Sequence, residues 1–320
     1  MLMELLIQNG SKVFIPVVLD GIEWTTERYG SPGKLTFKVL LDDALDITEG
    51  NAVRFKKDNK NIFYGFIFSK KMDKDRIITV TAYDQLRYLK NKATYVYENM
   101  TAGEVIKMIA SDFGLQTGSL ENTGYKIPSR VEDGKTLFDI IQGALDDTLT
   151  NQSYMYVMYD DFGKITLKGL DNMRLNLLID ESTGENFDYT SSIDDNTYNQ
   201  VKLYFDNEKT GQRDVYIVKD TNTIDKWGLL QYYESIEEGE DGKTKAEALL
   251  KLYNAKTRTL SIKNAIGDVR VRAGSMVVVM LDLGDVKVKN LMLVESCKHS
   301  FSENEHMMDI KLRGGGDFVA

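Results

Sequence analysis

Two histidines are the side chains in this sequence that are best suited to metal chemistry. His299 and His306 are the only histidines, and a turn over residues 302–305 could bring them together across a hairpin. Protein zinc sites use three or four His, Cys or carboxylate ligands, and two imidazoles without further soft ligands make a poor site. We therefore interpret both histidines as exposed hairpin residues, and we predict no metal-ligating residues.

A second chemical signature is Asp161-Phe162-Gly163, which copies the metal-binding tripeptide of protein kinases. A kinase also needs a Gly-rich loop, a strand lysine and a His-Arg-Asp loop, and the sequence has none of these. Because the tripeptide stands between two predicted strands, we interpret it as a turn. The same tripeptide at 112–114 is interpreted as the end of a helix.

Adjacent carboxylates are the remaining candidates for catalysis. The pairs are Asp42-Asp43, Asp146-Asp147 and Asp194-Asp195. A glycosidase needs two carboxyls across a cleft, and the sequence alone leaves such a pair open. Neighbouring acids in loops or at helix ends are usually solvated charge, and no nucleophile elbow, phosphate loop or dinucleotide fingerprint occurs. We predict that the protein is not an enzyme, with no catalytic residues, no cofactor-binding residues and no cofactor.

Tyrosines could supply a binding surface instead of a reaction. They gather at Tyr154, Tyr156, Tyr159, Tyr232 and Tyr233. A row of tyrosines on one strand face can stack sugars or bases. A half-buried sheet face or a subunit contact is the interpretation that we favour, because tyrosine is enriched at both.

Composition narrows the class of protein further. The chain has 320 residues, 42% of them hydrophobic, which is too long for one compact core and indicates several domains. The net charge is −9 and the basic residues are dispersed among acids, so we expect no specific nucleic-acid partner. No apolar run approaches the roughly 20 residues that cross a bilayer, and the start of the chain lacks the features of a signal peptide, so we expect no membrane insertion. The single cysteine, Cys297, excludes an internal disulfide and favours synthesis in the cytoplasm.

The elements that must position these residues are mostly strands. Alternating polar and apolar residues predict strands through the first 95 residues, for example over 34–40, 51–55, 62–68 and 76–83. Thr101 followed by Glu104 predicts a capped helix that stops at Gly114, and a second helix is predicted over 136–149. A hairpin follows over 154–167. Strands resume at 199–205 and 214–218, and a further helix is predicted from Lys243 to about Lys256.

A weak internal repeat relates the two ends of the chain. Residues 49–55, 65–71 and 77–83 form a Gly-started strand, a strand that ends in basic residues and an alternating strand. Residues 273–279, 293–299 and 307–313 repeat this order. Any two β domains can share such a pattern, but we favour duplication. The predicted fold is α+β and mainly β: two tube-like β-barrel domains at 1–95 and 171–320, a small α+β domain at 96–170, and a helical insertion in the second barrel at about 222–257.

Several segments together resemble the XkdQ/YqbQ group of baseplate hub proteins, found in PBSX-like prophages and contractile phage-tail-like bacteriocins. The segments that carry the likeness are 192–204, 226–234, 249–254, 258–260, 267–275 and 308–314. They are packing and turn signatures, so they support an identity but no active site. The likeness covers essentially the whole chain and is dense in its last 130 or so residues.

The resemblance implies the structural hub of a contractile tail baseplate. In such a hub, three copies with two barrels each form a pseudo-sixfold ring that connects the tail tube to the central spike. The implied partners are two further copies in a homotrimer, the spike protein, the tail tube and other baseplate proteins, with the tape-measure protein as a further candidate. The protein would be made in the bacterial cytoplasm and found in the virion or tail-like particle. Infective phage, defective prophage and bacteriocin all remain open, and the alternative function is a tail-associated cell-wall carbohydrate-binding protein or hydrolase.

Overall fold

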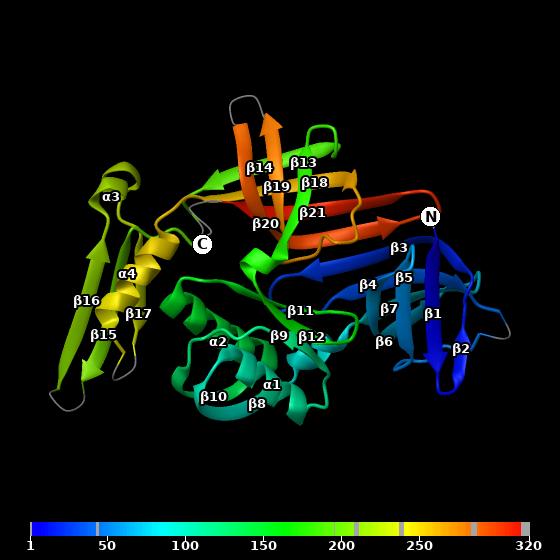
Figure 1. Cartoon of the computed structure of the whole chain (residues 1–320), viewed down its shortest axis with the longest axis horizontal. Coiled ribbons are helices and arrows are strands. Elements are labelled where there is room, and N and C mark those ends of the chain that lie inside the picture. Colours follow the sequence, from blue (N-terminus) through cyan, green and yellow to red (C-terminus); the bar gives the residue numbers. More distant parts are fainter. Residues whose placement is uncertain are drawn as a thin grey trace.

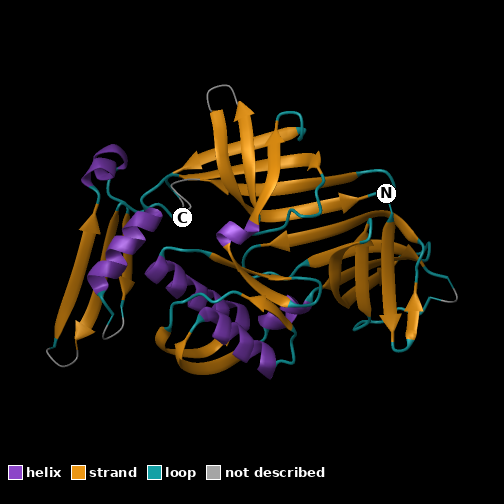
Figure 2. Ribbon diagram, viewed as in Figure 1, coloured by secondary structure: helices purple, strands orange, loops and turns teal. Residues whose placement is uncertain are grey.

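The computed structural model describes residues 2–42, 45–194, 196–207, 211–236, 240–282 and 287–314. Strands dominate, as predicted, and most of them belong to one 13-stranded sheet (Figures 1 and 2). In Figure 1 the N-terminal strands lie on the right, the C-terminal strands above, a helical module below and a small separate sheet on the left. No helix of the described segments is long and apolar enough to cross a bilayer.

The N-terminal strand set contains seven strands: β1 (Met3–Asn9), β2 (Lys12–Phe14), β3 (Val18–Glu27), β4 (Lys34–Leu40), β5 (Ala52–Lys57), β6 (Lys60–Met72) and β7 (Ile77–Tyr83). They pair antiparallel in the order β3-β4-β7-β6-β5-β1-β2. Asp58 and Asn59 both have positive φ and form the tight hairpin turn between β5 and β6. Alternation along β4 and β7 buries every second side chain, because successive residues of a strand point to opposite faces.

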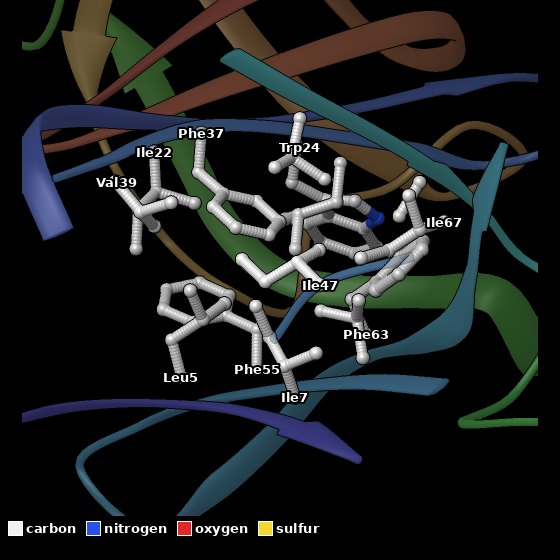
Figure 3. Packing of buried hydrophobic residues seen from close by; sticks show 14 of the residues in the cluster. Leu5, Ile7, Ile22, Trp24, Phe37, Val39, Ile47, Phe55, Phe63 and Ile67 are labelled. Atoms are coloured by element: carbon white, nitrogen blue, oxygen red, sulfur yellow. The ribbon is translucent and has the colours of Figure 1, made fainter. Parts of the chain in front are cut away.

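The buried faces of this set enclose one apolar core (Figure 3). Phe37 and Phe55 are fully buried at its centre. Phe301, from the other end of the chain, also belongs to this core and packs edge-on against Phe55 at 5.1 Å between ring centroids. The core of the first strand set is therefore completed by a residue of the last strands.

Replacing Gly65 by alanine should destabilise this core. A Cβ on Gly65 would collide with Tyr83 O and lie 2.6 Å from Phe63 Cζ, and a backbone oxygen cannot move aside as a side chain can. We expect a loss of about 2 kcal/mol in the free energy of unfolding, measured by urea denaturation. Gly143→Ala is the matched control, since Gly143 lies in a helix and its Cβ would meet only Glu132 Oε1 at 3.7 Å. That change should be neutral or stabilising by up to about 1 kcal/mol, and equal losses in the two variants would contradict the packing argument.

The middle module follows β7 in the chain and precedes β13, so it connects the N-terminal strands to the C-terminal strands. Its elements are the 3-10 helix η1 (Gln85–Lys90), β8 (Lys92–Met100), α1 (Ala102–Asp112), β9 (Thr117–Leu120), β10 (Ile127–Thr136), α2 (Leu137–Gln152), β11 (Tyr156–Asp160), β12 (Ile165–Gly169) and the 3-10 helix η2 (Leu170–Met173). The predicted capping box is confirmed, because the Thr101 hydroxyl accepts from Glu104 N and the Glu104 carboxylate accepts from Thr101 N. Leu86 and Leu89 pack in the core of this module. That core therefore begins about ten residues before position 96, where the α+β domain was predicted to start.

The C-terminal strand set has six strands: β13 (Arg174–Asp180), β14 (Asn186–Ser192), β18 (Thr257–Ile266), β19 (Met276–Asp282), β20 (Lys287–Phe301) and β21 (His306–Gly314). They follow the order β14-β18-β21-β20-β19-β13. The N-terminal set has the matching order β3-β4-β7-β6-β5-β1, so each strand has an equivalent in the same place. One difference is that β1 runs antiparallel to β5 whereas β13 runs parallel to β19. The shared strand order supports the predicted duplication.

A separate sheet interrupts the second set. It contains β15 (Gln200–Asn207), β16 (Gln212–Lys219) and β17 (Gln231–Ser235), with the helices α3 (Thr221–Trp227) and α4 (Gly242–Tyr253). The insertion predicted at about 222–257 was too short. The strands predicted over 199–205 and 214–218 also belong to this separate sheet and not to the main one. The physical reason is that Ala246 and Leu249 of α4 pack on Val201 and Leu203 of β15, which gives the insertion a core of its own.

The two predicted tube-like barrels are not closed in the part of the chain that the structure describes. Instead, the two strand sets are the two halves of one open sheet, because β20 pairs with β3. β20 is long enough to pair with β19 through its first half and with β3 through its second half. The sequence pattern marked the strands correctly, but it did not reveal this connection.

Candidate functional site

The seam between the strand sets is the region where the most unusual side chains meet. Six residue pairs join β3 to β20, from Glu27 opposite Ser296 to Ile22 opposite Phe301. Arg28 extends the seam, since its backbone N–H donates to Glu295 O and its guanidinium makes two bonds, of 2.8 and 2.9 Å, to the Glu295 carboxylate. The Arg28 side chain is only 3% exposed, so this ion pair is well shielded from solvent.

His299 lies in the seam, and His306 faces it from β21, the strand on the other side of β20. His299 Nδ1 is 2.9 Å from His306 Nε2, so the two rings do face each other across the hairpin as predicted. The prediction that they are exposed is wrong, because His299 is fully buried and His306 nearly so. β3 covers His299, and the Trp24 ring stacks on it at 5.1 Å.

A chain of hydrogen bonds fixes the protonation of both rings. Lys57 Nζ can only donate, so His306 Nδ1 accepts from it at 2.9 Å. His306 Nε2 then donates to His299 Nδ1, and His299 Nε2 donates to Val271 O at 2.8 Å. Burial lowers the pKa of His299 to about 4 and that of His306 to about 3, and the charge of Lys57 acts in the same direction. Both imidazoles are therefore neutral at pH 7, and they connect β5, β20 and β21 as hydrogen-bonding groups.

Cys297 lies beside this chain. Its Sγ is 3.1 Å from His299 Nε2, but that nitrogen already donates to Val271 O. Burial raises the pKa of the thiol well above its usual range, so it is not a ready metal ligand. Within the described ranges, no three His, Cys, Asp or Glu side chains are grouped to hold a metal ion.

Arg272, which is partly buried, lies at the centre of a second cluster where all three parts of the fold meet. Its guanidinium lies 4.1 Å from the ring centre of Tyr159 and 5.7 Å from that of Trp24, and it donates to Asp160 O at 2.8 Å. The carboxyls of Asp84 and Asp160 lie near it, and burial raises the pKa of both. Asp84 also accepts from the backbone N–H groups of Gly33 and Leu86. This cluster ties the first strand set, the middle module and the second strand set together.

Sequence reasoning missed this cluster. Its members are 112 or more residues from Arg272 in the chain, and none stands in a recognisable motif. The one usable signal was an arginine within the otherwise small and apolar stretch from Val271 to Gly274.

The two Asp-Phe-Gly tripeptides have the structural roles that were predicted. Asp161-Phe162-Gly163 is the turn between β11 and β12, and the Phe162 ring packs against Tyr64 of β6 at 5.9 Å. The second copy ends α1, where Phe113 is the C-terminal cap and Gly114 has a φ of +63°.

The carboxylate pairs do not converge on a cleft in the described segments. Asp147 pairs with Arg130, while the neighbouring Asp146 accepts from Gln142 on the same helix. Asp42 accepts from Leu45 N, and Asp194 lies exposed after β14. Asp43 and Asp195 lie outside the described residues.

The tyrosines are divided between two places. Tyr154 and Tyr156 pack edge to face at 5.1 Å, whereas Tyr159 is buried beneath Arg272, so the strand does not present an open row of three rings. In the insertion, Tyr232 stacks on Tyr253, while Tyr233 is half exposed.

Comparison with known proteins places this chain in a family. The YQBQ-like family model matches residues 22–313. The chain is 31% identical over 309 residues to YqbQ of Bacillus subtilis strain 168, covering 93% of this chain and 92% of that protein. It is 28% identical to the phage-like element PBSX protein XkdQ of the same organism, covering 93% of each. A 43 kDa tail protein of prophage MuSo2 from Shewanella oneidensis has the same fold, with a TM-score of 0.70 at 13% identity over 97% of this chain and 98% of that one. On the match to residues 22–313, this chain belongs to the YqbQ-like family.

Proposed function

We propose that this protein is a structural component of a phage-type tail, and that within it the chain acts as the baseplate hub. In this role three copies form a pseudo-sixfold ring that connects the tail tube to the central spike. The observation that carries the proposal is the duplicated strand order, in which two equivalent six-strand sets are joined side by side through β3 and β20. Three chains with two equivalent units each provide six similar positions for a sixfold tube and true threefold symmetry for a trimeric spike.

The internal chemistry of the fold supports a structural role. His299 and Arg272 each donate to a backbone carbonyl and each lie against an aromatic ring, so they hold segments together. The proposed partners are two further copies, the spike protein, the tail tube and neighbouring baseplate proteins, and the tape-measure protein is a further candidate. The two barrel-like regions and the middle domain of the predicted division are the proposed units of that assembly.

The test is the mass of the purified protein by light scattering, alone and with the cognate spike protein. We expect a trimer in at least one of these conditions, because surfaces that close a ring are exposed in an isolated copy. A monomer in both conditions, at concentrations well above those of assembly, would count against the hub. The alternative, a carbohydrate-binding protein or hydrolase of the cell wall, predicts binding to or hydrolysis of purified peptidoglycan by the same sample.

A further inference from the structure

The two strand sets can be aligned residue by residue through their pairing registers. Gly50 N–H donates to Ile67 O at 2.8 Å, and Gly274 N–H donates to Val294 O at the same distance. Both glycines have a φ near +90°. Immediately after these bonds, both long strands have a register shift of the same kind, between Ile67 and Ser69 in β6 and between Val294 and Ser296 in β20.

This alignment fixes the equivalents of the seam residues. On the long strands, Lys71 of β6 corresponds to Lys298 of β20, and Met72 corresponds to His299. On the edge strands, Trp24 of β3 pairs with Leu35, and Tyr189 of β14 pairs with Leu260. Leu260 is the equivalent of Leu35, so Tyr189 corresponds to Trp24.

One of the two equivalent seams is filled within the chain and the other is open. The second half of β20 pairs with β3, and its residue His299 is fully buried there. In the described structure the second half of β6 pairs only with β7, and Met72 is 59% exposed. The equivalent of β3, strand β14, likewise pairs only with β18 on one side. The chain therefore presents both sides of a seam: one is strand β14 at the end of the sheet, and the other is the half of β6 that extends beyond its pairing with β5.

We propose that these two edges pair with each other between copies of this chain. Residues Ser69–Met72 of β6 would lie antiparallel to β14 of the neighbouring copy, in the register of the β3–β20 seam. Lys71 would then lie opposite Thr190 of the neighbouring copy, and Met72 opposite Tyr189. Each contact is head to tail, so it repeats from copy to copy until the ring closes. The number of copies in that ring rests on the proposed function, whereas the register rests on the alignment alone.

The side chains on the open edges match those of the filled seam. In the filled seam Lys298 lies opposite Thr25, and its Nζ is 3.4 Å from a Glu23 carboxylate oxygen. The open edges carry Lys71, with Thr190 as its partner, and Asp188 takes the place of Glu23. The same lysine–threonine pair and the same opposite charges therefore recur between copies.

The inward-facing positions match in shape. Trp24 stacks on His299 in the filled seam, and Tyr189 over Met72 would bury a comparable ring against a thioether. Lysines on an unpaired strand can instead serve to prevent association. The two interpretations predict opposite results when copies are brought together.

Disulfide trapping between two variants, each with one added cysteine, distinguishes pairing of the open edges from lysines that prevent association. Arg28 N–H donates to Glu295 O, so Arg28 and Glu295 form a hydrogen-bonded pair. Hydrogen-bonded and non-hydrogen-bonded pairs alternate along antiparallel strands, and on this count Thr25 and Lys298 are a non-hydrogen-bonded pair. Pairs of that kind are closely spaced, which suits a disulfide. Lys71 and Thr190, at the equivalent positions, are both exposed, so Lys71→Cys and Thr190→Cys should fold normally, and the native Cys297 is buried. The two variants are mixed in equal amounts and oxidised, with and without the spike protein.

We expect a disulfide-linked dimer from the mixture and at least tenfold less from either variant alone. The double variant Lys71→Cys/Thr190→Cys should give covalent rings of the size found by light scattering. The control is Lys71→Cys mixed with Asn186→Cys, four residues along the same exposed strand, which should link at the level of a single variant. A ring by light scattering without this cross-link would overturn the strand pairing and leave the hub standing. A protein that stays monomeric and unlinked with the spike present would overturn both.

Discussion

Replacing Arg272 by methionine is expected to destabilise the folded chain by about 3–5 kcal/mol, because it leaves buried carboxyls without their cation. Asp84 and Asp160 lie near the guanidinium, and the pKa of each is already raised by burial and, for Asp84, by the charge of Asp160. The substitution also removes the bond to Asp160 O and the stacking on Tyr159. Three parts of the fold meet at this cluster, so we expect the whole chain to unfold at lower urea.

The control for this change is Arg270→Met. Arg270 is half exposed and pairs with its neighbour Asp268, and exposed pairs of this kind contribute at most about 1 kcal/mol. The difference in the free energy of unfolding between wild type and Arg272→Met should also become smaller from pH 7 to pH 5. A carboxyl whose folded-state pKa is raised takes up a proton as the pH falls, which relieves the uncompensated charge. A loss below about 1 kcal/mol at pH 7 would show that the two buried carboxyls do not need this cation.

Mild acid is expected to destabilise the protein through His299 and His306. Their folded-state pKa values are about 4 for His299 and about 3 for His306, below the usual value near 6.5. A histidine with a lowered folded-state pKa stabilises the fold fully above pH 6.5, and this contribution is lost as the pH falls toward 4. As the pH falls from 6.5 to 4.5, protonation of the unfolded state at each histidine should lower the free energy of unfolding by about 2 to 3 kcal/mol.

The measurement is urea denaturation at pH 7.5, 6.5, 5.5 and 4.5. The His306→Gln variant has one titrating group fewer, so its stability should fall about half as steeply over this range. Asp84 titrates in the opposite direction, since its folded-state pKa is raised, and it is present in both proteins. Equal slopes for wild type and His306→Gln would contradict the neutral, hydrogen-bonded state of the pair.

Local patterns in the sequence determined the elements of this protein. Thr101 and Glu104 are three residues apart in the chain, so their capping box needs no tertiary contact to be recognised. The alternation over 34–40 likewise predicted a half-buried strand, because the side-chain period is a property of the strand itself. The repeated order of strands at the two ends was visible for the same reason, and it pointed to the shared topology.

Only the tertiary structure decided how those elements combine. The pairing of β3 with β20 joins residues more than 250 positions apart, and nothing local in either strand specifies its partner. That pairing buries His299, which a hairpin considered alone would leave exposed, and it opens the sheet where two closed barrels were predicted. The bounds of the insertion were predicted wrongly for a similar reason. β15 alternates like any sheet strand, and only its packing on α4 shows that it belongs to a separate core. Period-two patterning states that one face of a strand is buried, while the choice of what covers that face is made by the long-range packing.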